Sequence, residues 1–198
     1  RLIADRLAQL EDAPSFVCAS AIGFYGSRGD EELREDSERG TGFLADVCVA
    51  WEEATQSAKD AGVRGVNGRI GIVLSPDGGA MQLMLPAFKM GMGGKLGDGA
   101  QYMSWISLHD LVETLIHCGR SDLQGPVNLT APNPVTNEVF TKSMGSALSR
   151  PTFFKVPKFA AKIALGEDMA TEMLLEGQRV LPQKLMDSGF SFRDTQLP

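Results

Sequence analysis

Basic residues are in short supply in this sequence of 198 residues. Its 19 lysines and arginines are outnumbered by 25 acidic residues, which gives a formal net charge of −6 at pH 7 and a sequence pI near 5.0. Nucleic-acid binding depends on a broad positive surface potential, and this charge balance does not supply one. We therefore expect no nucleic-acid partner.

Cysteine and histidine are scarce as well. The three cysteines, Cys18, Cys48 and Cys118, are far apart and form no CxxC pair. This is typical of buried free thiols in a reducing compartment, such as a bacterial cytoplasm, plastid stroma or mitochondrial matrix, and not of a disulfide framework or a zinc site. Both histidines, His109 and His117, fall on one predicted helix and no GxSxG elbow exists, so we expect neither a Ser/His/Asp triad nor a metal site.

Long apolar runs are lacking too. No stretch approaches the roughly 18 to 20 residues that cross a bilayer, so we expect a soluble protein without a membrane span. The composition, 43% hydrophobic and 22% charged, is ordinary for a globular domain. The chain does not begin with methionine, and residues 1–10 already have the periodicity of an amphipathic helix, so we expect the chain to start within a fold.

What is present is an alternation of short apolar runs and helical periodicity, which predicts an α/β layered sheet. Strands are predicted at residues 15–20, within 63–74, at 100–106 and at 127–130. Helices are predicted at 1–10, 41–61, 80–90, 108–118 and 137–148, with two more at 157–165 and 168–181. Ser107 and Asn137 are the expected N-caps of their helices. The stretch 21–42 is expected to be a long loop, and such loops often carry function.

A sheet of this type can bind a dinucleotide where a GxGxxG turn joins its first strand to a helix. No segment of this chain fits that pattern. Gly91, Gly93 and Gly94 follow a predicted helix and open none, so a flexible loop that shapes a pocket is favoured over a phosphate loop.

Several short motifs in the chain belong together. They are CASAIGFYG at 18–26, FLADVCVAWE at 43–52, RIGIVLSPDG at 69–78, MSWISLHDL at 103–111, GPVNLTAPNPVTNEVF at 125–140, QRVLP at 178–182 and GFSF at 189–192. As a set they resemble the second half of an extended short-chain dehydrogenase/reductase. The sequence is similar to one subgroup over essentially its whole length, the atypical epimerase-family proteins of the bacterial YfcH type and their plastid relatives.

That resemblance implies a fold and a cofactor. Residues 1–149 would form the rear part of a Rossmann-type doubly wound parallel sheet with interleaved substrate-region segments, and residues 150–198 a small, mostly helical, family-specific segment. The cofactor would be NADP or NAD. The family's glycine-rich turn and first strands are not in this chain, so we expect either a truncated sequence or a companion chain that supplies the first half.

The family's catalytic pair is the point where this sequence departs from its relatives. A YxxxK pair moves a proton and holds the ribose in catalytically competent members, but Phe43 stands at the tyrosine position and Val47 at the lysine position. Neither side chain can donate a proton. The catalytic candidates are therefore Ser20, at or next to the family's serine position, and Tyr25, a nearby phenol that would act as a displaced acid. Both residues also have a purely structural interpretation.

The resemblance also implies binding residues. The cofactor would contact Ser20, Ala21, Phe43, Val47, Arg69, Gly71 and Ile72, and the substrate would lie near Phe24, Gln101, Met103 and Trp105. Arg69 falls in a strand expected to be buried, where a cation needs a partner, so a ligand contact and a structural ion pair are both open. Alternation along one strand would put Gln101, Met103 and Trp105 on the same face, although Trp105 also suits the core.

Two hypotheses follow. The first is an atypical NAD(P)-binding protein without the Tyr–Lys pair, with an epimerase- or oxidoreductase-like reaction on an unidentified substrate or a nucleotide bound for stability or sensing. The second is a non-catalytic subunit that uses the same fold as a scaffold inside a larger assembly. A fold by itself does not choose between them.

Overall fold

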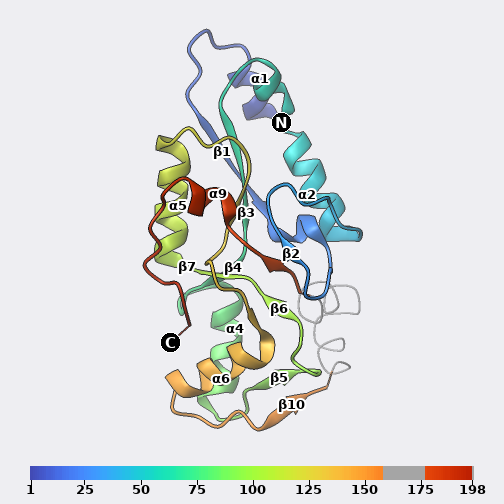
Figure 1. The fold of residues 1–198 in the computed structure, drawn as a ribbon, viewed down its shortest axis with the longest axis vertical. Coiled ribbons are helices and arrows are strands. Elements are labelled where there is room, and N and C mark those ends of the chain that lie inside the picture. The colour runs from blue at the N-terminus through green and yellow to red at the C-terminus, as the bar shows by residue number, and fades with distance from the viewer. Residues whose placement is uncertain (158–176, 198) are drawn as a thin grey trace.

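Three short runs of small and β-branched residues form the central sheet. The computed structural model describes residues 1–157 and 177–197, and within them β1 (Phe16–Ala21), β3 (Gly65–Ile70) and β8 (Gly125–Leu129) pair in parallel in the order β1-β3-β8. Figure 1 shows this sheet in the upper part of an elongated molecule. The α/β architecture with parallel strands is the one predicted.

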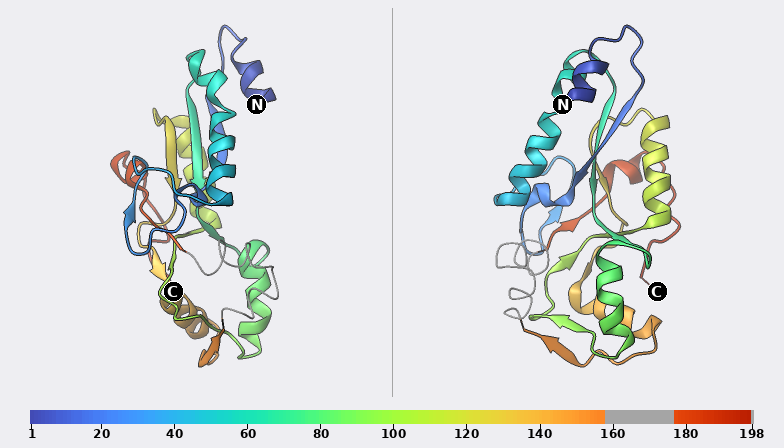
Figure 2. Two further views of the ribbon diagram at one scale, coloured as in Figure 1. Left: turned by 90° about the vertical axis from the view of Figure 1, so that its right-hand side faces the viewer. Right: turned by 180° about the vertical axis from the view of Figure 1, so that it is seen from behind.

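The two faces of the sheet differ in polarity. Val17, Val66 and Val127 pack with the helix α5 (Leu108–Arg120) in one hydrophobic core. Ser20 lies an odd number of residues from Val17 and so points to the other face, which is covered by α2 (Phe43–Glu53). Figures 1 and 2 show the two helices on either side of β1 and β3. The α5 face is therefore apolar, and polar side chains of the sheet collect under α2.

The predicted helix over 41–61 is two helices. After α2 the chain turns and resumes as α3 (Gln56–Asp60), which packs against α1 (Leu2–Leu7). The break lies at Thr55, whose buried hydroxyl donates to the Glu52 carbonyl oxygen at 2.7 Å and to Asn67 Oδ1 at 3.3 Å. Such side-chain bonds to nearby backbone compete with continued helix.

The lower part of the molecule is built from short elements around a second core of Phe88, Phe140 and Met144. Its helices are α4 (Gly79–Lys89), which contains Pro86 as predicted, and α6 (Asn137–Ala147). Its strand pairs are β4 (Ile72–Leu74) with β7 (Trp105–Ser107), β5 (Gly94–Leu96) with β10 (Phe154–Val156), and β6 (Tyr102–Met103) with β9 (Val135–Thr136).

The prediction of a single strand over 100–106 is wrong. Its residues form β6 and β7, which pair with different strands, so the expected shared face of Gln101, Met103 and Trp105 does not exist. The division falls at Ser104, which is 1% exposed. Its hydroxyl donates to the Gln178 carbonyl oxygen at 2.6 Å and accepts from the backbone N–H of residue 180 at 2.9 Å. These bonds are between distant parts of the chain, which a local pattern does not encode.

The two predicted N-caps had different outcomes. Ser107 accepts from the Asp110 N–H at 3.2 Å and caps α5, as expected. At α6 the prediction of Asn137 is wrong by one residue, because Thr136 accepts from the Val139 N–H. Asn137 is already helical, and its Oδ1 accepts from the Leu96 N–H at 2.9 Å.

The long loop over 21–42 contains regular structure. It begins as the 3-10 helix η1 (Ile22–Tyr25), and its β2 (Glu32–Leu33) pairs in parallel with β11 (Arg179–Val180). The helix predicted over 168–181 therefore does not include its last residues, which form β11. Residues 177 and 178 are not helical either, whereas residues 168–176, and nearly all of the helix predicted over 157–165, lie outside the described residues. A short helix, α9 (Gln183–Asp187), follows.

The described part of the chain bears on two expected absences. None of its helices is both long and apolar enough to cross a membrane. In the same residues, 1–157 and 177–197, no three His, Cys, Asp or Glu side chains gather in a group that could hold a metal ion.

Candidate functional site at the carboxyl edge of the sheet

Three polar residues lie side by side across the central sheet. Ser20 of β1 is in register with Arg69 of β3, and Arg69 is in register with Asn128 of β8. Each stands one residue before the end of its strand, so the row lies at the carboxyl edge. In doubly wound sheets this is the edge at which ligands bind.

A carboxylate from α2 joins two members of this row. Glu52 Oε1 accepts from Ser20 Oγ at 2.9 Å and from Arg69 Nε at 2.8 Å, and Glu52 Oε2 accepts from Arg69 Nη2 at 2.9 Å. The two-pronged pairing of a guanidinium with a carboxylate is the strong form of this contact. Arg69 is 3% exposed and would be costly to bury without it. Of the two interpretations open for Arg69, the structure contains the ion pair.

The phenol of Tyr25 joins the third member. Its hydroxyl donates to Asn128 Oδ1 at 2.7 Å and accepts from Arg69 Nη1 at 2.9 Å. The guanidinium carbon of Arg69 lies 3.4 Å from the ring centroid of Phe24, which is a cation–π contact. Arg69 is thus enclosed by Glu52, Tyr25 and Phe24. We call Ser20, Glu52, Arg69, Tyr25 and Asn128 the edge network.

Burial and the contacts with Arg69 together set the pKa values of the edge network. Tyr25 is 0% exposed, and its burial raises the pKa of the phenol, because the charge and hydrogen bond of Arg69 offset the loss of solvent only in part. Burial also acts to lower the pKa of Arg69, but its bonds to Glu52 and Tyr25 outweigh this and hold that pKa above its usual value. At neutral pH Tyr25 is a neutral phenol beside a cation.

A second buried carboxylate fastens the loop and the C-terminal segment to this site. Glu35 Oε1 accepts from the backbone N–H of Asn128 at 3.0 Å and of Lys184 at 3.2 Å. Burial raises the pKa of Glu35 in spite of these bonds. The Asn128 side chain in turn donates to the Leu181 carbonyl oxygen at 2.9 Å. Asn128 therefore ties β8 to Tyr25, to the loop and to the segment before α9.

The remaining predicted cofactor residues lie around the strand ends. Ala21, Gly71 and Ile72 are half-buried. The Gly71 N–H donates to the Leu129 carbonyl oxygen at 3.1 Å, which continues the pairing of β3 with β8. Phe43 is the first residue of α2 and is 70% exposed, and Val47 is half-buried one turn later.

The predicted substrate residues are not brought together. Phe24 belongs to the surroundings of Arg69, whereas the other three lie on the chain between β5 and α5. Met103 Sδ is 3.4 Å from Asn137 Nδ2, and Gln101 Nε2 donates to the Leu96 carbonyl oxygen at 3.4 Å. Trp105 is 2% exposed and donates to the Asn133 carbonyl oxygen at 3.2 Å. It therefore belongs to the core, which was one of the two roles open for it.

The sequence analysis missed two residues of this site, Asn128 and Glu52, and the sequence held a signal for Glu52. It lies one helical turn after Cys48, which is buried against η1. A charged residue on the buried side of a helix needs a partner in the sheet beneath, and this was the available signal. Arg69 was the one buried charge expected, and a search for its carboxylate on the buried side of the neighbouring helix would have found Glu52.

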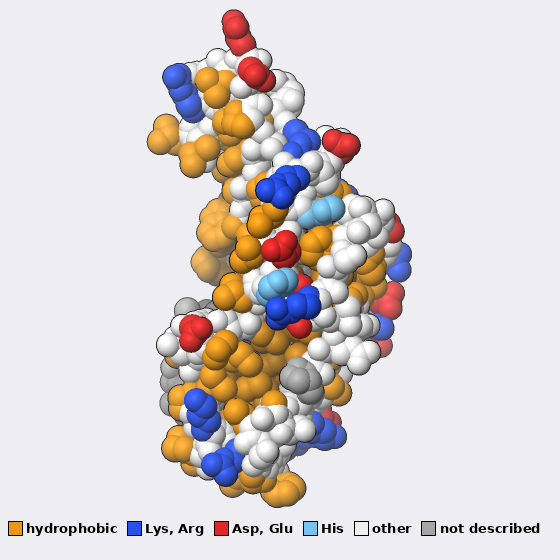
Figure 3. Space-filling view, turned by 90° about the vertical axis from the view of Figure 1, so that its left-hand side faces the viewer, with side chains coloured by type: hydrophobic (Ala, Val, Ile, Leu, Met, Phe, Trp, Pro, Cys, Tyr) orange, Lys and Arg blue, Asp and Glu red, His pale blue; other side chains and the backbone are white. Residues whose placement is uncertain are grey.

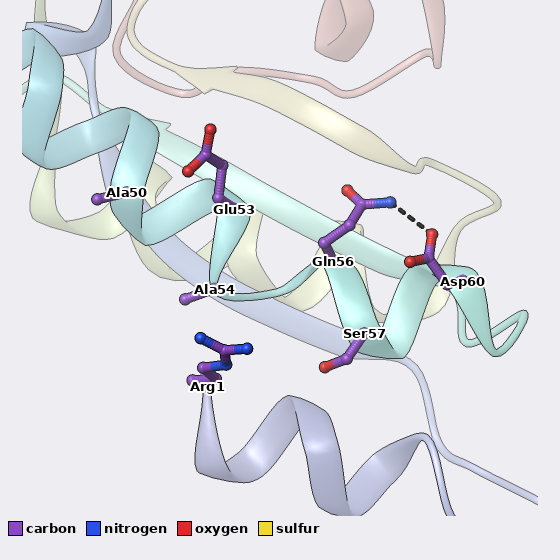
Figure 4. A pocket seen from close by; sticks show the side chains of 7 residues that line it. All are labelled: Arg1, Ala50, Glu53, Ala54, Gln56, Ser57 and Asp60. Atoms are coloured by element: carbon purple, nitrogen blue, oxygen red, sulfur yellow. Dashed lines mark hydrogen bonds between the residues drawn. The ribbon is translucent and has the colours of Figure 1, made fainter.

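The molecule also has a cavity away from this edge. It has a volume of about 510 Å³ and is lined by polar side chains of α3 together with Arg1 and Glu53 (Figure 4). Glu53 is the last residue of α2 and the neighbour of Glu52, but no residue of the edge network lines the cavity. None of the predicted site residues lines this cavity.

Comparison with known proteins gives close matches in sequence. A protein-family model described as a domain of unknown function, DUF1731, matches residues 156–198. The chain is 49% identical to an epimerase family protein of Mycobacterium bovis over 90% of this chain and 59% of that protein. It is 42% identical to the chloroplastic epimerase family protein SDR39U1 homolog of Arabidopsis thaliana over 89% of this chain and 50% of that protein. The chain thus spans about half to three fifths of these relatives.

Solved structures match in fold as well. The human epimerase family protein SDR39U1 (isoform 2), determined with NADPH, superposes with a TM-score of 0.91 and 33% identity, over 99% of this chain and 67% of that one. A nucleoside-diphosphate sugar epimerase from Corynebacterium glutamicum gives a TM-score of 0.78 and 38% identity, over 98% and 38%. The Thermus thermophilus UDP-glucose 4-epimerase complex with NAD, at 18% identity and a TM-score of 0.70 over 91% and 60%, shares the fold.

Proposed function

Since this chain belongs to the epimerase family of the SDR39U1 type, we propose that it forms the rear part of an NAD(P)-binding site at the carboxyl ends of β1, β3 and β8. The observation that carries the proposal is the in-register row of Ser20, Arg69 and Asn128 at the edge where nucleotides bind in such sheets. The relative determined with NADPH supports it.

The residues at this edge suit one end of such a cofactor. No GxGxxG turn occurs among the 198 residues, so this chain does not offer the usual cradle for a pyrophosphate. Ala21, Gly71 and Ile72 are small or apolar and half-buried beside the row, which fits a flat nicotinamide ring. When bound, the cofactor would supply hydride transfer. The residues of this chain would orient the ring and keep water from it.

The edge network would hold these residues in place. Through Glu52 it joins α2 to the ends of β1 and β3, and through Tyr25 and Asn128 it joins η1 to β8. A site held by buried, hydrogen-bonded groups is preorganised, which reduces the cost of ordering on binding. With Phe43 and Val47 in place of a Tyr–Lys pair, an epimerase- or oxidoreductase-like reaction here would proceed without the usual proton transfer.

Calorimetric titration of the full-length protein with NADPH and NADH tests the proposal. We expect saturable binding of at least one of them. Ile72→Ala should weaken that binding several-fold, because apolar contact with the ring is lost, but should leave binding of the same nucleotide without its nicotinamide unchanged. Ile116→Ala, at a 41% exposed position of α5, is the matched control. Absence of binding of both dinucleotides would contradict the proposal.

A further inference from the structure

The contact between Tyr25 and Arg69 is of a kind that favours loss of the phenolic proton. A phenol that accepts a hydrogen bond from a cation at 2.9 Å is placed to lose its proton, because the cation favours the phenolate. That arrangement makes an acid–base group out of a tyrosine. Here, however, the same cation is bound by Glu52 through two of its nitrogens.

We propose that Glu52 is the positioning residue of this site: by neutralising Arg69, it keeps the Tyr25 hydroxyl protonated and donating to Asn128. In this arrangement the Tyr25 proton serves to hold η1 to β8 and is not available for transfer. The inference concerns the same edge of the sheet as the proposed function but does not require a bound cofactor.

The geometry supports these roles of Glu52 and Tyr25. The side chains of Arg69 and Glu52 are 4% and 14% exposed, so solvent screens their attraction little. Asn128 Oδ1 can only accept, and it lies 2.7 Å from the Tyr25 oxygen, so that bond requires the phenolic proton. The described charged groups that act on Tyr25 are Arg69 of β3 and Glu35 of the loop, and Glu35 also disfavours the phenolate.

Ser20 depends on the same carboxylate. Its hydroxyl donates to Glu52 Oε1, the same oxygen that accepts from Arg69 Nε. Both oxygens of the ionised carboxylate accept, Oε1 from Ser20 and Arg69 Nε and Oε2 from Arg69 Nη2, whereas a glutamine has one accepting oxygen and an amide that only donates. Glu52→Gln therefore removes the counter-charge of Arg69 and replaces one of the two accepting oxygens with a donor, with little change in side-chain size.

The test is a spectroscopic titration of Tyr25 in the full-length protein without cofactor. The tyrosinate absorbance of each variant is followed against pH, and the curve of the same variant carrying Tyr25→Phe is subtracted, which leaves the signal of this one phenol. We expect Glu52→Gln to lower the Tyr25 midpoint by about one pH unit or more, because Arg69 then has only the phenolate as a counter-charge. The double variant Glu52→Gln/Arg69→Gln should bring the midpoint back up. Glu53→Gln, on the neighbouring residue outside the edge network, should leave it unchanged.

A midpoint that does not move in folded Glu52→Gln would overturn the inference, and so would a fall that persists after Arg69→Gln. Breaking a buried ion pair can prevent folding, so Glu52→Asp is measured in parallel. Aspartate keeps the negative charge but is shorter, so it holds Arg69 less closely, and we expect a smaller fall in the Tyr25 midpoint. An unchanged midpoint would count against the inference. Because no cofactor is present, failure of this test leaves the proposed function standing, and absence of NAD(P) binding leaves this inference standing.

Discussion

Tyr25 combines complete burial with two hydrogen bonds, and both partners are buried residues. The sequence analysis named Tyr25, Ser20 and Arg69 as candidate site residues through the family resemblance, and it left a structural role open for each. It did not identify Glu52 or Asn128, whose roles depend on contacts between distant segments. The buried side of α2 was a signal for Glu52 in the sequence, but its pairing with Arg69, like that of Asn128 with Tyr25, forms only when the helix and the loop pack on the sheet.

Tyr25→Phe tests the role of the phenol at the scale of a single residue. The change leaves Arg69 Nη1 and Asn128 Oδ1 without their partner in a buried site, so we expect the free energy of unfolding to fall by about 1–3 kcal/mol. NADPH affinity should fall as well, because η1 is no longer held to β8. Urea unfolding and calorimetric titration measure the two effects.

Tyr102→Phe is the control for this variant, since the Tyr102 ring contacts Arg179 in another part of the fold. The alternative role of Tyr25, that of a displaced acid, predicts a different pattern, in which turnover is lost while cofactor affinity stays unchanged. Unchanged stability together with unchanged affinity would contradict a positioning role.

Single elements were predicted well where their own residues determine them. The helix α5 was predicted nearly to its ends, because its apolar periodicity and its Ser107 cap are both local. The break after α2 and the division between β6 and β7 were missed, because Thr55 and Ser104 form their bonds with Asn67 and with residues 178 and 180. The motifs that resemble the family predicted the parallel sheet. Strand pairs such as β2 with β11 were not predicted, because they depend on tertiary packing.

Asp110 gives a prediction at the scale of an element. It lies in the first turn of α5 and is 1% exposed, and each of its oxygens accepts a backbone N–H of the C-terminal tail, from Arg193 at 3.0 Å and from Asp194 at 2.9 Å. Asp110→Asn keeps one acceptor and presents a donor to the other N–H. We expect a loss of about 1–3 kcal/mol in the free energy of unfolding and faster hydrogen exchange at residues 193 and 194.

Asp122→Asn is the control for the tail, because Asp122 lies beyond the C-terminal end of α5 and lines a different hollow with Lys184. Exchange at residues 193 and 194 that is as slow in Asp110→Asn as in the unaltered protein would show that these bonds do not hold the tail.

At the scale of the whole molecule, hydrophobic surface remains at the outer edge of the sheet. Among the described residues β1 pairs on one side only, with β3. Beside its other edge lies a hollow of about 580 Å³ lined by apolar residues, including Leu2, Ile3 and Trp51, which are 85%, 63% and 54% exposed. Figure 3 shows a second broad hydrophobic area on the lower part of another face. Open strand edges with apolar neighbours are sites of association.

This edge leads to a prediction for the 198-residue chain expressed alone. We expect it to self-associate in sedimentation velocity and to bind a dye specific for exposed apolar surface, because β1 offers free backbone groups next to the apolar hollow. The double variant Leu2→Glu/Trp51→Glu should reduce both effects, since two like charges would then face each other across an association interface. Phe153→Glu, at a 92% exposed position before β10, places a similar charge elsewhere and should have a smaller effect. A monodisperse monomer without dye binding would show that the β1 edge does not associate, and a larger effect of Phe153→Glu than of the double variant would place the association on the lower part of the molecule.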